Sequence, residues 1–308
     1  MAETICQLSV QLWGYRIRNN EWRANVIALR KQYSTLLDEV YKLSSLTSVL
    51  DGPNDLVKEG ANANEILIPK MSMQGLADYN KQTGYVDGDV TLEYETKKCT
   101  YDRGRMFAVD AMDNIESAGI AFGRLSGEFL RTKVVPELDT WRLASYAQIN
   151  GITTVSANLA DGKGALAALR TARGKIENAE ANLATCYLFI DPTVYGMIED
   201  LDTTASKKAI EGFAGVVKVP AGRFYSKVDL VANGAGGYSK NAKGLAMNFL
   251  IVDKQAAIQF QKHTVSKIIT PDQNQSADAW KFGYRTVGIA ECKDNKKDGI
   301  YVHTVASA

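Results

Sequence analysis

The chain has 308 residues, of which 45% are hydrophobic and 23% are charged, as in an ordinary folded protein. Its 36 Lys and Arg residues nearly balance its 35 Asp and Glu residues, so the formal net charge of +1 excludes an overall field that attracts nucleic acid or an anionic membrane. No run of about eighteen apolar residues and no basic, then apolar N-terminus is present, which argues against a membrane span and a classical export signal.

The N-terminal part is predicted to form a helical arm. Between residues 21 and 50, apolar side chains recur at three- and four-residue spacing with charges between them. The sequence Asp51-Gly-Pro-Asn54 ends this pattern, because proline lacks an amide donor and glycine and asparagine favour turns. The apolar run from Ile66 to Ile68 then predicts one strand that ends at Pro69.

A polar ribbon of alternating side chains follows this strand. It runs from Tyr85 to Phe107, and few of its positions are strongly apolar. The pattern predicts a two-stranded hairpin with Lys97 and Lys98 near its tip. An isolated hairpin is marginal in water, and neither face of this one can be well buried within one subunit, so it is expected to pack on something else.

Two helices are predicted after the ribbon. From Asp113 to Gln148, about 35 residues at 1.5 Å each would span roughly 50 Å, well beyond the mean globular helix. Pro136 is expected to kink this helix or divide it in two. The segment from Gly162 to Thr185 is predicted as the second helix, with one apolar face.

The pattern from about residue 185 onward is typical of a compact α/β unit. We predict strands at 187–190, 216–219, 224–231 and 245–252, and helices at 193–201 and 253–260, each helix preceded or led by an aspartate. The glycine-rich segment from Asn233 to Tyr238 is predicted as a loop. Residues 278–292 and 299–304 are predicted to form a final hairpin around the turn at 293–299 and to return to the layer of the long helix.

No catalytic, cofactor-binding or metal-ligating constellation is recognisable. None of the four cysteines is part of a CxxC pair, which fits a reducing compartment. His263 and His303 lack ligand spacing and are interpreted as polar surface or interface residues, whereas Cys186 begins an apolar strand and is interpreted as a buried thiol. A pair of Cys186 with His263 remains open, because such partners meet only in the fold. The sequence therefore predicts no enzyme, no metal and no cofactor.

Four strings of sequence carry a resemblance to a known family. Phe107 to Asn114 leads into the long helix, Val134 to Ala144 lies within it, and Ala277 to Arg285 and Asn295 to Tyr301 lie near the C-terminus. With the order of the elements, they make residues 33–305 similar to the major capsid proteins of tailed bacteriophages, which have the Hong Kong 97-type capsid fold.

The resemblance implies an α+β phage major capsid fold of five segments. These are an N-terminal helical arm (1–60), an extended β-hairpin loop with flanking strands (61–112), a peripheral domain with a long spine helix (113–184), an axial α/β domain (185–270) and a C-terminal return to the peripheral domain (271–308). The chain would then be a structural subunit that assembles with itself into the icosahedral shell around the DNA genome of a tailed phage. Its expected location is the virion, after assembly in the host cytoplasm.

The resemblance also implies partners. Copies of the chain form pentamers and hexamers, and further partners are scaffold, portal and decoration proteins and packaged DNA held by non-specific contact, but no membrane. About thirty residues precede the family-like pattern, so a separate scaffold protein or self-sufficient assembly is expected. Some relatives crosslink a loop lysine to an asparagine of a neighbour, and Lys97 or Lys98 with Asn295 would be the counterparts here. Contacts between subunits are expected at Val86, Val90, Leu92, Tyr94, Lys97, Lys98, Tyr101, Gly234, Gly236, Gly237 and Tyr238.

Two alternatives remain open. An encapsulin-like nanocompartment shell of the same fold would enclose a cargo enzyme instead of a genome, and the sequence separates these two poorly. A small-molecule enzyme built on the α/β segment would need a convergent polar constellation, which the sequence does not show.

Overall fold

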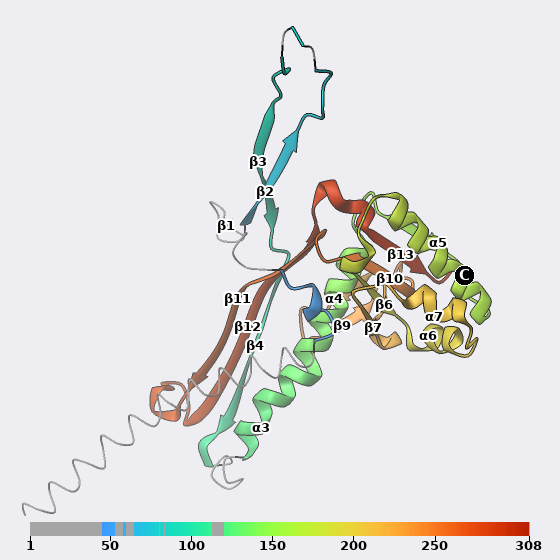
Figure 1. Ribbon diagram of the computed structural model, residues 1–308. Coiled ribbons are helices and arrows are strands. Elements are labelled where there is room, and N and C mark those ends of the chain that lie inside the picture. Colours follow the sequence, from blue (N-terminus) through green and yellow to red (C-terminus); the bar gives the residue numbers. More distant parts are fainter. Residues whose placement is uncertain are drawn as a thin grey trace, which may run out of the picture. The chain divides into compact units, whose positions relative to one another are not determined.

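The computed structural model describes residues 45–52, 58–59, 65–79, 81–82, 84–112 and 120–307 (Figure 1). Most of the predicted arm and the first seven residues of the predicted long helix lie outside these ranges. The described end of the arm is a turn followed by one 3₁₀ turn, Ser48–Leu50, so the prediction of an α-helix up to residue 50 is wrong there.

The chain contains two compact units. The smaller comprises Met1–Ser45, Arg105–Leu138 and Val265–Tyr284, and the larger comprises Leu46–Gly104, Asp139–Thr264 and Arg285–Ala308. The strands are β1 (Lys58–Glu59), β2 (Glu65–Met73), β3 (Val90–Lys98), β4 (Tyr101–Asp110), β5 (Thr153–Ser156), β6 (Cys186–Ile190), β7 (Gly215–Lys218), β8 (Val228–Leu230), β9 (Tyr238–Lys240), β10 (Met247–Asp253), β11 (Ala257–Ile269), β12 (Ala279–Cys292) and β13 (Ile300–Thr304). The α-helices are α3 (Ile120–Phe129), α4 (Val135–Ala147), α5 (Gly162–Asn178), α6 (Pro192–Glu199) and α7 (Thr204–Ile210). Short 3₁₀ turns lie at Leu183–Thr185, Ala221–Arg223, Pro271–Gln273 and Asp294–Gly299.

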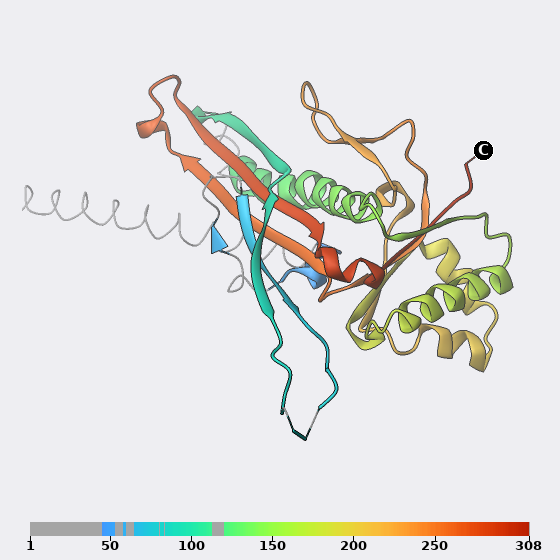
Figure 2. The ribbon, with the colours of Figure 1, turned by 90° about the horizontal axis from the view of Figure 1, so that it is seen from above.

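A five-stranded sheet forms the core of the larger unit, with the order β5-β13-β10-β6-β7. The central strand β10 pairs antiparallel with β13 and β6, and all seven of its residues are buried. Side chains on one face, such as Leu188 and Ile251, pack with α5, α6 and α7, which Figure 2 shows together at one side of the sheet. Side chains on the other face, such as Phe189 and Leu250, pack with Leu143 of α4. The predicted α/β unit therefore has apolar cores on both faces of its sheet.

The local signals of this unit are partly confirmed. Strand β6 and helix α6 form as predicted, and the Asp191 carboxylate caps α6 by accepting a hydrogen bond from the amide of Thr193. Helix α5 ends at Asn178 instead of Thr185, because the chain turns at Glu180, whose φ of 59° is left-handed.

The predicted long helix is confirmed from Ile120 to Ala147, with one irregularity. Between α3 and α4 lies a π-helical turn, Leu130–Val134, directly before Pro136. Because α4 continues this turn without a break, Pro136 removes an amide donor from within the helix, and the expected interruption takes the form of the wider turn that precedes it. In the smaller unit, Leu130 packs with Phe282.

Two predictions about the C-terminal third are wrong. The helix predicted at 253–260 is replaced by a turn and by β11, because the Asp253 carboxylate accepts from the amide of Gln255 and from the hydroxyl of Thr185. The final hairpin does not form either, because β12 lies between β11 and β4 whereas β13 lies between β5 and β10. The 3₁₀ segment Asp294–Gly299 turns the chain from one sheet into the other.

A buried polar network holds the chain where it emerges from the arm. The fully buried Asp139 carboxylate accepts hydrogen bonds from the amides of Leu46 (2.9 Å) and Thr47 (3.2 Å) and from the Thr47 hydroxyl (2.6 Å). Arg142 donates to the same hydroxyl (3.0 Å), and Gln259 donates to the Thr47 carbonyl (2.6 Å). Charged groups in such a site are stable because each has partners, so this network fixes the start of the larger unit.

Candidate self-assembly surface

The extended hairpin of the larger unit is built from β2 and β3. The two strands pair antiparallel from Glu65 opposite Lys98 to Met73 opposite Val90 (Figure 1). The prediction that Lys97 and Lys98 lie near the tip is therefore wrong. They lie at the base, the segment 74–89 joins the strands at the far end, and Tyr101 already belongs to β4.

Pro69 lies inside β2, although the sequence predicts that a strand ends there. Proline cannot donate to a strand ladder and is tolerated where one side of the strand has no neighbour. Among the described residues, β1 pairs with Ile66 and Leu67, and from residue 68 onward β3 is the one neighbour of β2 that these ranges show. The strand therefore continues through Pro69 to Met73.

The register sorts the hairpin into two chemically different faces. Residues directly opposite in an antiparallel pair share a face, and faces alternate along each strand. One face carries apolar pairs, Met71 with Leu92 and Met73 with Val90. The other face carries polar pairs, Lys70 with Glu93 and Ser72 with Thr91. We call Met71, Met73, Val90, Leu92 and Tyr94 the apolar face.

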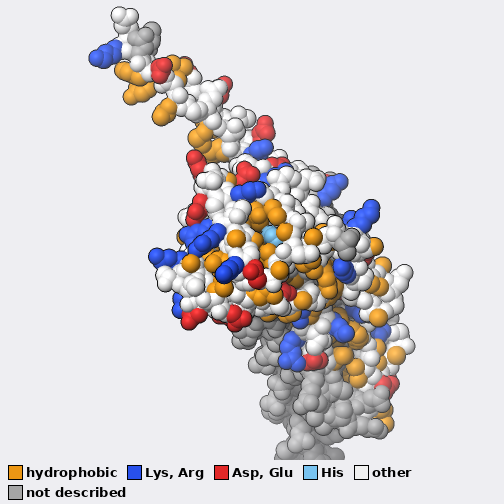
Figure 3. All heavy atoms as spheres, turned by 90° about the vertical axis from the view of Figure 1, so that its right-hand side faces the viewer, with side chains coloured by type: hydrophobic (Ala, Val, Ile, Leu, Met, Phe, Trp, Pro, Cys, Tyr) orange, Lys and Arg blue, Asp and Glu red, His pale blue; other side chains and the backbone are white. Residues whose placement is uncertain are grey.

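The apolar face is exposed in the isolated chain. Met73, Val90 and Leu92 keep 65%, 67% and 54% of their surface in contact with solvent. Nine of the twelve exposed large hydrophobic side chains among the described residues lie between positions 71 and 94, and Figure 3 shows hydrophobic side chains along the projecting hairpin. Exposed apolar surface costs about 25 cal/mol per Å² relative to burial, and such a concentration marks an interaction surface.

The tip continues this apolar character. Leu76 is fully exposed, and the rings of Tyr79 and Tyr85 contact each other with centroids 5.0 Å apart. Val86, predicted as a contact residue, is exposed next to them. The tip and the apolar face therefore form one continuous strip of exposed, largely apolar surface.

The base of the hairpin has an apolar anchor and an ionic anchor on its polar face. Ile66 is buried with Ile258 and Ile289, and Lys97, directly opposite Ile66, places its ammonium 2.6 Å from Glu95 and 3.6 Å from Asp294. Burial opposes the charge of Lys97, but the hydrogen bond and charge of Glu95 and the charge of Asp294 outweigh it, so the pKa of Lys97 is raised.

This environment bears on the crosslinking role considered for Lys97. An ammonium group has no lone pair with which to attack an amide, and a raised pKa keeps Lys97 in that form. Its bonds within its own chain therefore favour a structural role. Lys98 lies opposite Glu65 in the register of β2 and β3, and its side chain is exposed.

Tyr101 is a correction to the predicted contact residues. Only 2% of its surface is exposed, and its ring lies against Trp141 with centroids 4.8 Å apart. It is part of the core of its own chain and its side chain is not accessible to another copy. The next residue, Asp102, accepts two hydrogen bonds from the guanidinium of Arg285 (2.9 and 2.6 Å). The strand that follows the hairpin is therefore fixed on both sides.

The glycine-rich loop between β8 and β9 contains the other predicted contact residues. Gly234, Gly236 and Gly237 have φ values of 66°, 69° and 84°, a region that side chains other than glycine rarely adopt. Gly234 is exposed and its two companions are half-buried. Tyr238 ends the loop and donates from its hydroxyl to the carbonyl of Gly222 (3.2 Å).

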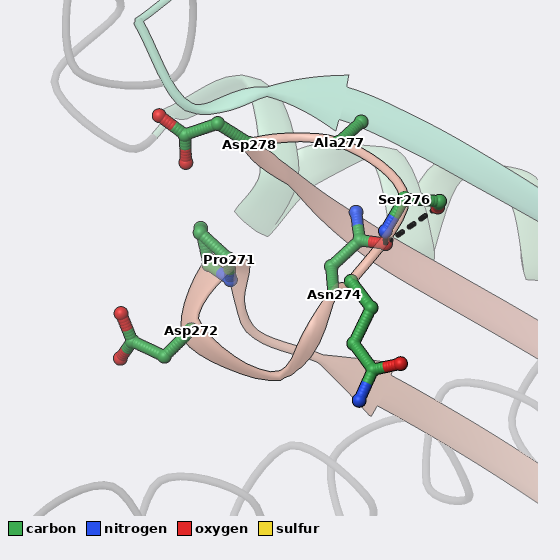
Figure 4. A pocket seen from close by; sticks show the side chains of 7 residues that line it. Pro271, Asp272, Asn274, Ser276, Ala277 and Asp278 are labelled. Atoms are coloured by element: carbon green, nitrogen blue, oxygen red, sulfur yellow. Dashed lines mark hydrogen bonds between the residues drawn. The ribbon is translucent and has the colours of Figure 1, made fainter.

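The described residues also line two hollows. One of about 380 Å³ lies at the hairpin base, lined by Lys97 and Lys297 together with Glu291 and Asp294. The other, of about 420 Å³, is at the turn between β11 and β12, where the Asn274 side chain accepts from the hydroxyl of Ser276 (2.8 Å) (Figure 4). Lys97 and Lys297 pair with Asp294 in the first hollow, and Asn274 pairs with Ser276 in the second, as in structural ion pairs and turns.

The cysteine and histidine considered for chemistry whose side chains the structure describes, Cys186 and His303, are both buried. Burial and the Asp253 carboxylate raise the pKa of Cys186 to about 12, which confirms its interpretation as a buried thiol. The prediction of a surface or interface position for His303 is wrong, because it is buried, stacked on Phe249 and 3.0 Å from the Asn248 amide nitrogen, and burial lowers its pKa. The side chain of His263 lies outside the described part.

Two absences concern the described residues only. Within the ranges that the structure covers, no group of three His, Cys, Asp or Glu side chains is placed to hold a metal ion. Within the same ranges, no helix has the length and apolar character needed to cross a membrane.

Comparisons with known proteins bear on the fold. No family profile and no curated protein matches the sequence. The structure is similar to solved structures from Gordonia phage Cozz (TM-score 0.55, 12% identity, 86% of this chain and 87% of that chain), the capsid of cyanophage P-SCSP1u (0.52, 12%, 82% and 86%) and the mature capsid of bacteriophage PhiM1 (0.51, 13%, 80% and 83%). The chain therefore has the fold of the major capsid proteins of tailed phages. This is the Hong Kong 97-type capsid fold, a mixed helix and sheet architecture.

Proposed function

We propose that this chain is a major capsid subunit that assembles with itself, through pentamers and hexamers, into the icosahedral shell of a tailed phage. The observation that carries the proposal is the hairpin, which projects from the larger unit with an apolar face exposed to solvent. A subunit gains nothing from such a face alone, whereas a second copy that covers it removes the surface from water. The role is structural rather than catalytic, and its place is the virion.

Closure of a shell makes modest contacts sufficient. Each copy meets several others, and once some contacts have formed the remaining ones become intramolecular, so weak pairwise affinities add up to a stable particle. The nearly neutral net charge of +1 suits a wall of many copies, because repulsion among them stays low.

The proposal is tested by electron microscopy of the purified chain and of a variant in which Gln74–Asp89 is replaced by a short glycine-serine turn. This deletion removes the tip and keeps the β2–β3 register and the buried Tyr101. The intact chain is expected to form shells or capsomers, with or without added scaffold protein, and the variant is expected to remain a folded, unassembled subunit. Closed shells from the variant, or an intact chain that stays monomeric in every condition including with scaffold, would overturn the proposal. Nuclease-protected DNA in particles from infected cells supports genome packaging, and a co-purifying enzyme would instead favour a cargo compartment.

A further inference from the structure

Arg103 joins the strand that follows the hairpin to the glycine-rich loop. Its Nη2 atom donates hydrogen bonds to the carbonyls of Val231 (2.9 Å) and Gly237 (3.3 Å). These two residues are the ends of the loop, since the amide of Val231 also donates to the carbonyl of Gly237 (2.9 Å). One guanidinium thus closes the loop at its neck, and all of these atoms belong to the larger unit.

The loop is rich in glycine, the residue with the most backbone freedom. Three of its glycines have positive φ, and glycine loses more backbone freedom on ordering than any other residue. Within the loop, Asn233 accepts one long hydrogen bond from the amide of Gly236 (3.4 Å). Charge-assisted hydrogen bonds from an arginine are among the stronger ones in proteins, so the two bonds of Arg103 help to order the loop at its neck.

The position of Arg103 is in turn set by its neighbours. Tyr101 is buried against Trp141, and the Asp102 carboxylate accepts hydrogen bonds from Nε and Nη2 of Arg285. On the other side, Lys97 near the end of β3 pairs with Glu95 of the same strand and with Asp294 outside it. A segment of seven residues, 97–103, therefore runs from the hairpin base to the loop neck and is fastened at both ends.

We propose that Arg103 is a positioning residue that holds the glycine-rich loop in the conformation in which it contacts other copies, so that the hairpin and the loop are presented in a fixed mutual geometry. The ordering of the loop by Arg103 is independent of assembly. The contact with other copies rests on the proposed function.

The first part is tested by amide hydrogen exchange on unassembled subunits of wild type, Arg103→Ala and Arg105→Ala. Arg105 lies two residues further along β4, so R105A is a control that removes the same charge from the same strand. We expect exchange at residues 231–237 to accelerate at least about tenfold in R103A and to stay within about twofold of wild type in R105A. Unchanged loop exchange in R103A, or equal acceleration in R105A, would overturn the inference. If R103A does not fold, R103K takes its place under the same criterion, because a lysine ammonium lacks the reach and planar fork of the guanidinium.

The second part is tested by assembly of the same proteins. R103A is expected to give fewer closed shells than R105A, although its hairpin is intact. Normal shells from R103A with a demonstrably loosened loop would overturn the contact role of the loop and leave its ordering by Arg103 standing. A wild-type chain that never assembles would contradict the proposed function, whereas the exchange result would still decide whether Arg103 orders the loop.

Discussion

Strands β10 and β3 of the larger unit use hydrophobic residues in opposite ways. Every residue of β10 is buried between two apolar clusters, whereas no residue of β3 is fully buried and its apolar side chains face solvent. Hydrophobic burial within the chain stabilises the subunit, and hydrophobic exposure on the hairpin provides for association. On the proposed function, folding and assembly therefore depend on different residues, and single substitutions should separate them.

The largest effect is expected in the five-stranded sheet. Leu250→Ala removes a fully buried side chain and should lower the free energy of unfolding by about 2–5 kcal/mol, because a cavity adds to the lost burial. Leu92→Ala, the same change on the hairpin, should alter it by no more than about 0.5 kcal/mol. Denaturant unfolding of unassembled subunits measures both, and similar losses in the two variants would contradict the comparison.

A smaller loss is expected at the buried polar network. Asp139→Ala leaves the amides of Leu46 and Thr47 without their acceptor and should cost about 1–3 kcal/mol in unfolding free energy. Glu128→Ala, which removes an exposed ion pair with Arg131, is the control and should cost less than about 1 kcal/mol. An Asp139 variant as stable as this control would show that the network does not hold the start of the unit.

The smallest effect concerns the ionic anchor of the hairpin. Glu95, whose carboxyl can donate to Asp294 once it is protonated in acid, the hydrogen bond from Lys297, and the charges of Lys97 and Lys297 lower the pKa of Asp294 to about 2, against the opposing effect of burial. A carboxyl with a lowered folded pKa stabilises the fold above its unfolded pKa of about 3.9, and this contribution is lost as the pH falls toward 2.

Asp294→Asn tests this anchor. The variant should be less stable than wild type by at most about 1 kcal/mol at neutral pH, and the difference should shrink between about pH 4 and pH 2. Unfolding free energies of both proteins across this range measure it. A difference that is constant or grows with acidification would show that the Asp294 charge does not strengthen the base.

The sequence predicts those elements whose cause is local. Strand β6, the aspartate cap and proline of α6, and most of the spine helix follow from residue spacing and end signals. The wrong elements are those whose partners are distant. Strand β3 pairs with β2, to which a sixteen-residue tip joins it, and not with the strand that follows Lys97 and Lys98. Strands β12 and β13 lie in different sheets instead of pairing with each other. Alternation shows that a segment is a strand, but it does not say which strand it pairs with.

The candidate surface could be predicted only in part, because some of its features have local signals and others depend on distant partners. Val90, Leu92 and Tyr94 are exposed as expected, because alternation in β3 is visible in the sequence. Met71 and Met73 are not among the predicted contact residues. Their spacing of two is a strand signal, but the sequence predicts that the strand ends at Pro69. Arg103 carries no local signal at all, since its acceptors lie more than a hundred residues away.

The most direct test of the central claim is a pair of substitutions at adjacent positions of β3, Leu92→Glu on the apolar face and Thr91→Glu on the polar face. Both add one negative charge to the same exposed strand, and both should leave the unfolding free energy nearly unchanged. Electron microscopy of the two purified proteins under assembly conditions gives the readout. We expect shells from T91E and only unassembled subunits or capsomers from L92E. Shells from L92E as abundant as those from wild type would show that the apolar face does not mediate assembly.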